Sequence, residues 1–226
     1  MYQNVYFEKQ NNIIHCWDDK KGYFTKKYRK YAYVRDGNGS YKSIHGERLK
    51  KLNYWSREDN LKLYESDVNE VTRFLIDEYG DSDEISEGHV TMTFDIEVEM
   101  NSGLPDMQEA ANDITSIAYH DSATNEYCVY VVTPGTEINK KIKGATVRSF
   151  NNEGDLLLAF LTSWEEISPT IITGWNIDFF DVTYLYNRIK LLFGTTVANR
   201  VSPIGKVHWN KYRKRYIIAG VSALDY

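Results

Sequence analysis

Residues 170–193 read TIITGWNIDFFDVTYLYNRIKLLF, and this stretch decides the fold of the second half of the chain. The short apolar run at 170–175 predicts a buried strand, and the apolar positions that follow Asp181 return at helical spacing. We therefore predict a strand over 170–175, then a helix over 181–193 that packs one face on a sheet. Gly194 is placed to end this helix.

The acidic stretch FDIEVE at 94–99 is the second informative segment. Alternate residues of a strand point to the same face, so Asp95 and Glu97 project together while Phe94 and Ile96 face the core. Two neighbouring carboxylates repel each other unless a cation neutralises them, and hard oxygen ligands suit Mg²⁺ or Mn²⁺ better than zinc. The alternative is a pair of solvated acids, because this pattern also arises by chance at strand ends.

Three polar residues around the strand-to-helix junction extend this candidate site. A carboxylate at the start of a helix is favoured by the free N–H groups and the dipole there, so helix capping is the alternative explanation for Asp181. Asn176 suits either the orientation of a substrate phosphate or the closing of a turn. Asp178 has no matching motif, and we expect it at the surface or in the cap.

The first 64 or so residues are strand-like and predict a small antiparallel sheet. A helix is expected next, with Ser66 as its N-cap and Gly80 at its end. The acidic segment 81–87 contains no apolar run, so we predict a domain boundary near residue 88, with domains at 1–88 and 89–226. The strands expected in the first domain are 2–8, 13–17, 28–35 and 41 onward, with a hairpin turn at 36–39.

The second domain is expected to be mixed α/β. A helix capped by Asn151 or Asn152 and stopped by Pro169 precedes the strand and helix described above. The three strands expected before it are 89–97, 115–119 and 127–133. The resulting order of strand, strand, strand, helix, strand, helix is ribonuclease-H-like.

The composition is that of a globular protein, with 226 residues, 42% hydrophobic content and a formal net charge of −5. This acidity excludes a surface that grips nucleic acid everywhere, so any such contact must be local. Cys16 and Cys128 lack metal-ligand spacing, which favours reduced thiols. No apolar stretch approaches 18 residues and no signal pattern opens the chain, so we expect a soluble cytoplasmic protein without membrane contact.

Residues 206–216, KVHWNKYRKRY, mix cations with aromatic side chains. We predict a basic hairpin in which Trp209, Lys211 and Arg213 are candidate contacts to single-stranded nucleic acid. The alternative is a solvated hairpin with a stabilising aromatic face. The same alternatives apply to residues 20–33, where we favour a strand with its polar side in solvent.

The segments FDIEVE, GWNIDFFDVTYLYNRI, SPIGK and SALDY resemble the exonuclease region of family B DNA polymerases, and those of T-even-like phages in particular. The resemblance runs through most of 89–226, and residues 1–88 resemble the N-terminal domain of that family more weakly. It implies an α/β (α+β) fold: a ribonuclease-H-like exonuclease domain after a small, mainly antiparallel β domain with a helix. The implied reaction is 3′→5′ hydrolysis of a single-stranded DNA end, which in such polymerases is proofreading during DNA replication. A phage-encoded chain would act in the infected host cell.

The resemblance also assigns roles to matching positions. Asp95 would bind two Mg²⁺ or Mn²⁺ ions, Glu97 would bind the first of them and help to position water, and Asp181 would reach the metals from its helix. One ion would lower the pKa of water, and both would stabilise the charge on the attacking and leaving oxygens. Asn176 and Phe180 join the hairpin residues as candidate substrate contacts. In those polymerases a hairpin near here helps to part primer from template, and a shorter hairpin leaves that role open.

The chain departs from the family in one respect. Such exonucleases complete their site with an Asp four residues after a Tyr, and no such pair follows Asp181. We therefore expect an exonuclease domain that is incomplete at its C-terminus, that cannot polymerise and is a poor nuclease alone, and that a second polypeptide completes or that was cut from a longer chain. Two alternatives stay open. One is a non-catalytic nucleic-acid-binding or regulatory module, and the other is a stand-alone nuclease whose fourth ligand is Asp225 or an acid of another copy.

Overall fold

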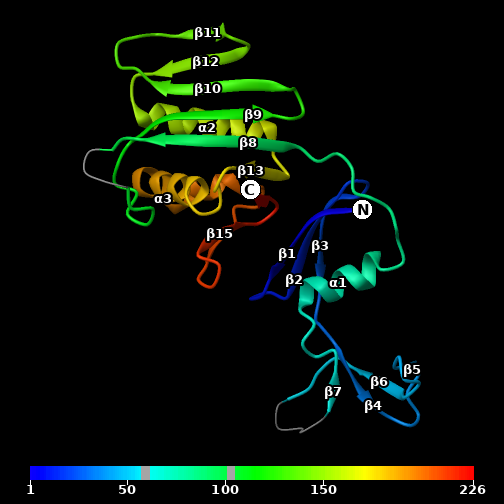
Figure 1. The fold of residues 1–226 in the computed structure, drawn as a ribbon. Coiled ribbons are helices and arrows are strands. Elements are labelled where there is room, and N and C mark those ends of the chain that lie inside the picture. Colours follow the sequence, from blue (N-terminus) through cyan, green and yellow to red (C-terminus); the bar gives the residue numbers. More distant parts are fainter. Residues whose placement is uncertain (57–61, 101–104) are drawn as a thin grey trace. The chain divides into compact units, whose positions relative to one another are not determined.

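The computed structural model describes residues 1–56, 62–100 and 105–226 (Figure 1). The chain divides into two compact units, Met1–Glu87 and Gly88–Tyr226. Across the described ranges, no helix combines the length and the apolar character needed to cross a membrane.

The first unit contains two small antiparallel sheets and a helix, in the orders β1-β2-β3 and β5-β6-β4-β7. Its elements are β1 (Tyr2–Glu8), β2 (Ile13–Asp18), β3 (Gly22–Lys27), β4 (Ala32–Arg35), β5 (Tyr41–Lys42), β6 (Arg48–Leu52), β7 (Leu63–Tyr64) and α1 (Glu70–Tyr79). Apolar side chains of the first sheet pack on Phe74 of α1, with Ile14 and Cys16 fully buried. Burial of these side chains, rather than strand length, holds the small sheet against the helix.

Two expectations for this unit are wrong in detail. The strand predicted over 28–35 begins only at Ala32, and Tyr28 and Tyr31, which precede it, instead donate their hydroxyls to the Asp77 carboxylate on α1. The helix is capped by Asn69 and not by Ser66, since the Asn69 side chain accepts the Thr72 N–H at 2.9 Å. Asn is as good an N-cap as Ser, and sequence alone does not choose between two caps three residues apart.

The second unit is mixed α/β, with one seven-stranded sheet in the order β11-β12-β10-β9-β8-β13-β16 and a separate hairpin β14-β15. The sheet is mixed, because β10 with β12, β8 with β13, and β13 with β16 are parallel pairs. Its elements are β8 (Thr91–Val98), β9 (Ile114–Asp121), β10 (Glu126–Val132), β11 (Asn139–Ile142), β12 (Ala145–Phe150), α2 (Glu153–Ile167), β13 (Ile171–Gly174), α3 (Asp181–Phe193), α4 (Thr195–Ala198), the 3₁₀ helix η2 (Asn199–Val201), β14 (Val207–Asn210), β15 (Arg215–Ile218) and β16 (Ser222–Asp225).

The two faces of the sheet differ in what covers them. Phe94 on β8 packs against Phe160 and Trp164 of α2, with ring centroids 5.9 Å apart in both pairs. Because side chains alternate along a strand, Asp95 and Glu97 then point to the face that α2 does not cover. Asn152 caps α2 by accepting the Asp155 N–H at 2.9 Å, as one of the two expected caps. The alternation of FDIE thus separates the core from the candidate site.

The order of elements contains two strands that the sequence did not indicate, β11 and β12. All four residues of β11 are exposed, so this edge strand lacks the apolar alternation on which a strand prediction depends. The strand over 170–175 and the helix over 181–193 are confirmed as β13 and α3, and α3 reproduces the predicted bounds. Long amphipathic helices give the stronger sequence signal.

Candidate metal-binding site

The candidate site lies where three neighbouring parallel strands end. β13 pairs with β8 on one side and with β16 on the other, so the carboxyl ends of all three strands meet at one edge of the sheet. Asp95 lies in the part of β8 that extends past its last pair with β13, Asp225 ends β16 opposite Gly174, and Asp181 follows the turn after β13. The topology therefore gathers carboxylates that are far apart in the sequence.

Asp181 is held directly against β8. Its Oδ1 atom accepts the backbone N–H of Ile96 at 3.0 Å, and Ile96 is the residue between Asp95 and Glu97. The residue is 4% exposed. Among the described residues no side chain caps the N-terminus of α3, but Asp181 lies in the first turn of this helix, where the dipole favours a carboxylate, so a helix-start role and a ligand role are compatible. This hydrogen bond brings the first and second acidic motifs together.

The surroundings of Asp181 disfavour its charged form. Burial raises the pKa of its carboxyl to about 6, and the negative charges of Asp95 and Asp225 add to the shift, while the hydrogen bond from Ile96 opposes it. A bound cation would stabilise the charged form of this carboxyl, because it would offset both the lost hydration and the repulsion from the neighbouring carboxylates.

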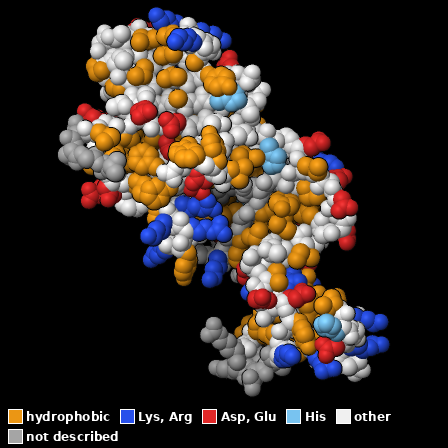
Figure 2. Space-filling model, in the orientation of Figure 1, with side chains coloured by type: hydrophobic (Ala, Val, Ile, Leu, Met, Phe, Trp, Pro, Cys, Tyr) orange, Lys and Arg blue, Asp and Glu red, His pale blue; other side chains and the backbone are white. Residues whose placement is uncertain are grey.

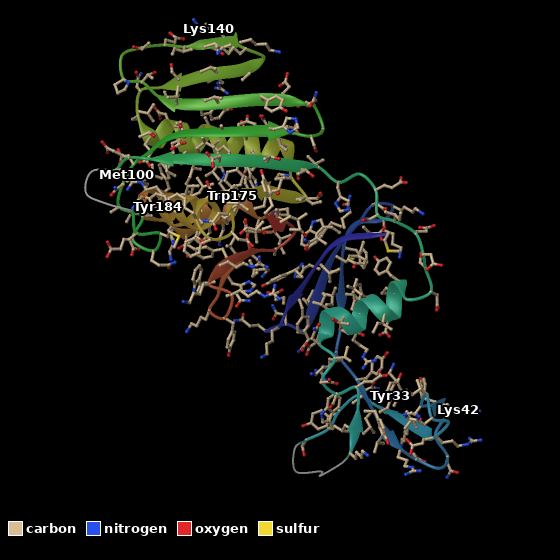
Figure 3. The ribbon with its side chains drawn as sticks, in the orientation of Figure 1. Tyr33, Lys42, Met100, Lys140, Trp175 and Tyr184 are labelled. Carbon is tan, nitrogen blue, oxygen red and sulfur yellow. The ribbon has the colours of Figure 1, made fainter. Side chains whose placement is uncertain are left out.

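Asp95 and Glu97 remain accessible from solvent. Both side chains are exposed, whereas the flanking Phe94 and Ile96 are buried. Asp95 also borders a groove of about 340 Å³ on the sheet face opposite α2, whose other walls include Trp175 and Tyr127. Trp175 is 74% exposed and follows the end of β13 (Figure 3). The groove places aromatic surface beside a carboxylate.

Asn176 closes the turn between β13 and α3. Its backbone adopts a left-handed conformation with φ of 55°, and its carbonyl accepts the Phe180 N–H at 3.1 Å. Asn tolerates this conformation better than most residues. Its side chain is exposed, so the turn role and a substrate role are compatible. Phe180 stacks on Tyr184 with ring centroids 5.4 Å apart, and much of its ring therefore serves packing.

The expectation for Asp178 is wrong. It is 7% exposed and forms an ion pair with Arg215 of β15, instead of lying at the surface or capping the helix. The Thr183 hydroxyl also donates to the Asp178 carbonyl, at 3.2 Å. Nothing in the sequence around Asp178 indicates that it pairs with Arg215, which lies 37 residues later.

Residues 207–218 form the expected hairpin, with β14 and β15 antiparallel. The Asn210 side chain accepts the N–H groups of Tyr212 and Arg213, both at 3.0 Å, and so shapes the turn. Lys211 and Arg213 are exposed there, and Figure 2 shows Lys and Arg side chains gathered where Figure 1 places this hairpin. Trp209 packs on Tyr216 at 5.0 Å, which supports the aromatic-face alternative for Trp209.

The carboxylates near Ile96 are of the ligand type that binds hard divalent cations, although they do not form a complete coordination sphere. Within the described ranges, no three His, Cys, Asp or Glu side chains already stand as a metal-binding group. Asp181 is turned to the Ile96 N–H, while Asp95 and Glu97 extend from the strand. Carboxylate oxygens of this kind are the ligands that Mg²⁺ and Mn²⁺ prefer. The hydrogen bond from Ile96 thus places Asp181 against the part of β8 that carries Asp95 and Glu97.

The sequence is similar to those of known DNA polymerases. Residues 80–226 match the model of the exonuclease domain of DNA polymerase family B. The chain is 37% identical to the DNA-directed DNA polymerase of Escherichia phage RB69 over 59% of its length, and 28% identical to that of Enterobacteria phage T4 over 96%. The DNA polymerase catalytic subunit of human herpesvirus 7 is 33% identical over 47% of the chain. These alignments span 18%, 29% and 10% of the respective relatives.

Proposed function

Because the chain belongs to DNA polymerase family B through its exonuclease domain, we propose that it carries most of a two-metal site for 3′→5′ hydrolysis of single-stranded DNA ends. The observation that carries this proposal is the hydrogen bond from Ile96 N–H to Asp181, which joins the two acidic motifs. In a polymerase such a site would serve proofreading during DNA replication.

Asp95, Glu97 and Asp181 would hold Mg²⁺ or Mn²⁺ in this proposal. When bound, such ions lower the pKa of water and stabilise the charge on the attacking and leaving oxygens. The protein's own part is to hold Asp181 in a buried position beside two accessible carboxylates. Burial is the main cause of the raised pKa of Asp181, and the negative charges of Asp95 and Asp225, which add to it, also disfavour DNA phosphate without a cation.

The surroundings of the site suit a single strand. Asn176 presents an exposed amide beside Trp175, and Lys211 and Arg213 supply exposed positive charge on the hairpin. Aromatic surface for bases, with cations for phosphates, is the usual combination in proteins that bind single strands. We assign Phe180 a supporting role, since its ring stacks on Tyr184.

We further propose that the second unit is a ribonuclease-H-like exonuclease domain that is incomplete by itself, and that residues 1–88 form the N-terminal domain of a polymerase. A further segment, in a second polypeptide or in a longer chain, would supply the fourth acid and the polymerase domains. Asp225 is the alternative fourth ligand, because its charge already acts on Asp181. For a phage-encoded chain the site of action would be the infected host cell.

The test uses a 5′-labelled single-stranded oligonucleotide and the whole chain. We expect Ca²⁺, which supports binding with little cleavage, to tighten binding of the strand relative to EDTA, and Mn²⁺ to allow slow shortening from the 3′ end. Both effects should disappear in the Asp95→Asn, Glu97→Gln double variant, because two of the three ligands lose their charge. A strand with a blocked 3′ end is the matched control for polarity.

The same experiment separates the alternatives. Binding that is indifferent to metal and to the double variant would favour a non-catalytic nucleic-acid-binding module and contradict the proposal. Mn²⁺-dependent shortening that Asp225→Asn abolishes would assign the fourth ligand within the chain. The thermal midpoint of each variant should be measured alongside, so that loss of folding is not mistaken for loss of the site.

A further inference from the structure

The turn at 175–180 is fixed from two sides. On one side the end of β16 holds it, because Ile177 N–H donates to Asp225 Oδ1 at 3.1 Å and Asn176 N–H to the Tyr226 carbonyl at 3.3 Å. On the other side the hairpin holds it through the ion pair between Arg215 and Asp178. The turn leads directly into Asp181.

This ion pair is partly buried, and some of its hydrogen-bonding atoms have no partner among the described residues. The side chains of Asp178 and Arg215 are 10% and 26% exposed. Among the described residues, neither Asp178 Oδ1 nor Arg215 Nε has a hydrogen-bond partner. A buried pair with unused hydrogen-bonding groups adds little net stability, because the cost of desolvation offsets much of the attraction. The ion pair therefore matters more for the position of the turn at 175–180 than for stability.

The residue next to Arg215 anchors the hairpin a second time. The Tyr216 hydroxyl donates to Asn187 Oδ1 at 2.7 Å, and the Tyr216 ring lies 4.2 Å from that of Tyr186, both on α3. The hairpin therefore contacts the turn before α3 through Arg215 and the helix itself through Tyr216. Asp181 begins the helix between these two attachments.

We propose that Asp178 and Arg215 are positioning residues, which hold the turn so that the Asp181 carboxylate stays against the Ile96 N–H. A displacement of the hairpin would then reach Asp181 through Arg215. The inference rests on the proposed function for the meaning of Asp181 as a ligand, but the geometric coupling stands on the contacts alone. Arg215 also brings a fixed positive charge to a region rich in carboxylates.

The test is hydrogen exchange of the Ile96 amide, measured by NMR on the whole chain without metal or DNA. In Asp178→Asn and in Arg215→Gln we expect this amide to exchange about fivefold faster, because the loosened turn weakens the hydrogen bond to Asp181. The double variant should exchange no faster than either single variant, since both break the same link. Reversal of the pair, Asp178→Arg with Arg215→Asp, should restore part of the protection.

The ion pair between Arg200 and Glu165 provides the matched control. Both of its side chains are more exposed, at 34% and 44%, and it joins η2 to α2. Arg200→Gln should leave the exchange rate of the Ile96 amide unchanged. The inference is overturned if Asp178→Asn and Arg215→Gln lower the thermal midpoint without changing the Ile96 exchange rate. This readout needs no nuclease activity, so its failure is distinct from failure of the oligonucleotide test.

Discussion

Two clusters of carboxylates in the second unit each contain an arginine, and they differ in how completely the hydrogen bonds of that arginine are satisfied. Around Arg188 on α3, the guanidinium donates to Glu153 through two nitrogens at 2.8 and 2.6 Å, to the carbonyls of Ala110 and Ala111, and to Asp113. Around Asp181, Arg215 pairs with Asp178, and its own Nε has no hydrogen-bond partner in the described part of the chain. The first cluster is complete and the second is not.

We propose that the two clusters have different roles. A buried charge pair whose hydrogen bonds are all satisfied fixes a structure, and the Arg188 cluster joins α3 to the start of α2. The cluster at the end of β8 leaves Asp181 under the repulsion of Asp95 and Asp225. An added cation would relieve that repulsion, so the incomplete cluster is the one suited to binding a metal.

The largest effect should follow from breaking the complete cluster. In Arg188→Met we expect the free energy of unfolding to fall by about 3 to 5 kcal/mol, because Glu153 stays buried without its cation. Denaturation in urea measures this. Arg200→Met, which removes an exposed pair, should cost under about 1 kcal/mol. Equal losses in the two variants would show that the Arg188 cluster is not the stabilising one.

A smaller effect, of opposite sign, is expected at Asp181. Its pKa is about 6 in the folded chain and 3.8 in the unfolded one, so between these pH values the folded state binds more protons and stability falls as pH rises. Asp181→Asn removes this penalty and can still accept the Ile96 N–H. Without metal, the variant should be more stable than wild type by up to about 3 kcal/mol at pH 8, with the gain shrinking between pH 6 and pH 4. A gain that does not depend on pH would contradict this account.

The smallest effect concerns the second anchor of the hairpin. Tyr216→Phe keeps the ring against Tyr186 and removes the hydroxyl that donates to Asn187. Loss of one neutral hydrogen bond should cost about 1 kcal/mol of stability. Calorimetric melting measures this, with Tyr212→Phe at a fully exposed hairpin position as the control. A loss as large as that of Arg188→Met would place the hairpin among the main stabilising elements.

The sequence predicts much of this site because its residues obey local rules. Alternation in FDIE separates Asp95 and Glu97 from the buried Phe94, and helical spacing after Asp181 defines α3. The contact between β8 and the start of α3 could not be predicted in this way. It depends on the parallel pairing of β8 with β13, which no local pattern encodes. The resemblance to exonuclease motifs supplied that part.

Long-range partners were missed for the same reason. The ion pair of Asp178 with Arg215 joins a turn to a hairpin across 37 residues, and neither residue carries a periodic signal. The approach of Asp225 to the turn requires β16 to add to the sheet beside β13. Successive residues of a strand point to opposite sides, so Arg215 and Tyr216 face different neighbours. This alternation is the signal that could have suggested that the hairpin has two separate contacts.

The most direct test of the central claim is a titration of the isotopically labelled chain with Mn²⁺, which broadens the NMR signals of nearby amides. The account predicts that small additions selectively broaden the amides of residues 94–98, 176–182 and 225, and that Asp95→Asn with Glu97→Gln removes this effect. Amides around Glu153 and Arg188 should be unaffected, because that cluster already has its cation. Broadening centred on the Arg188 cluster, or the same broadening in the double variant, would contradict a metal site at the end of β8.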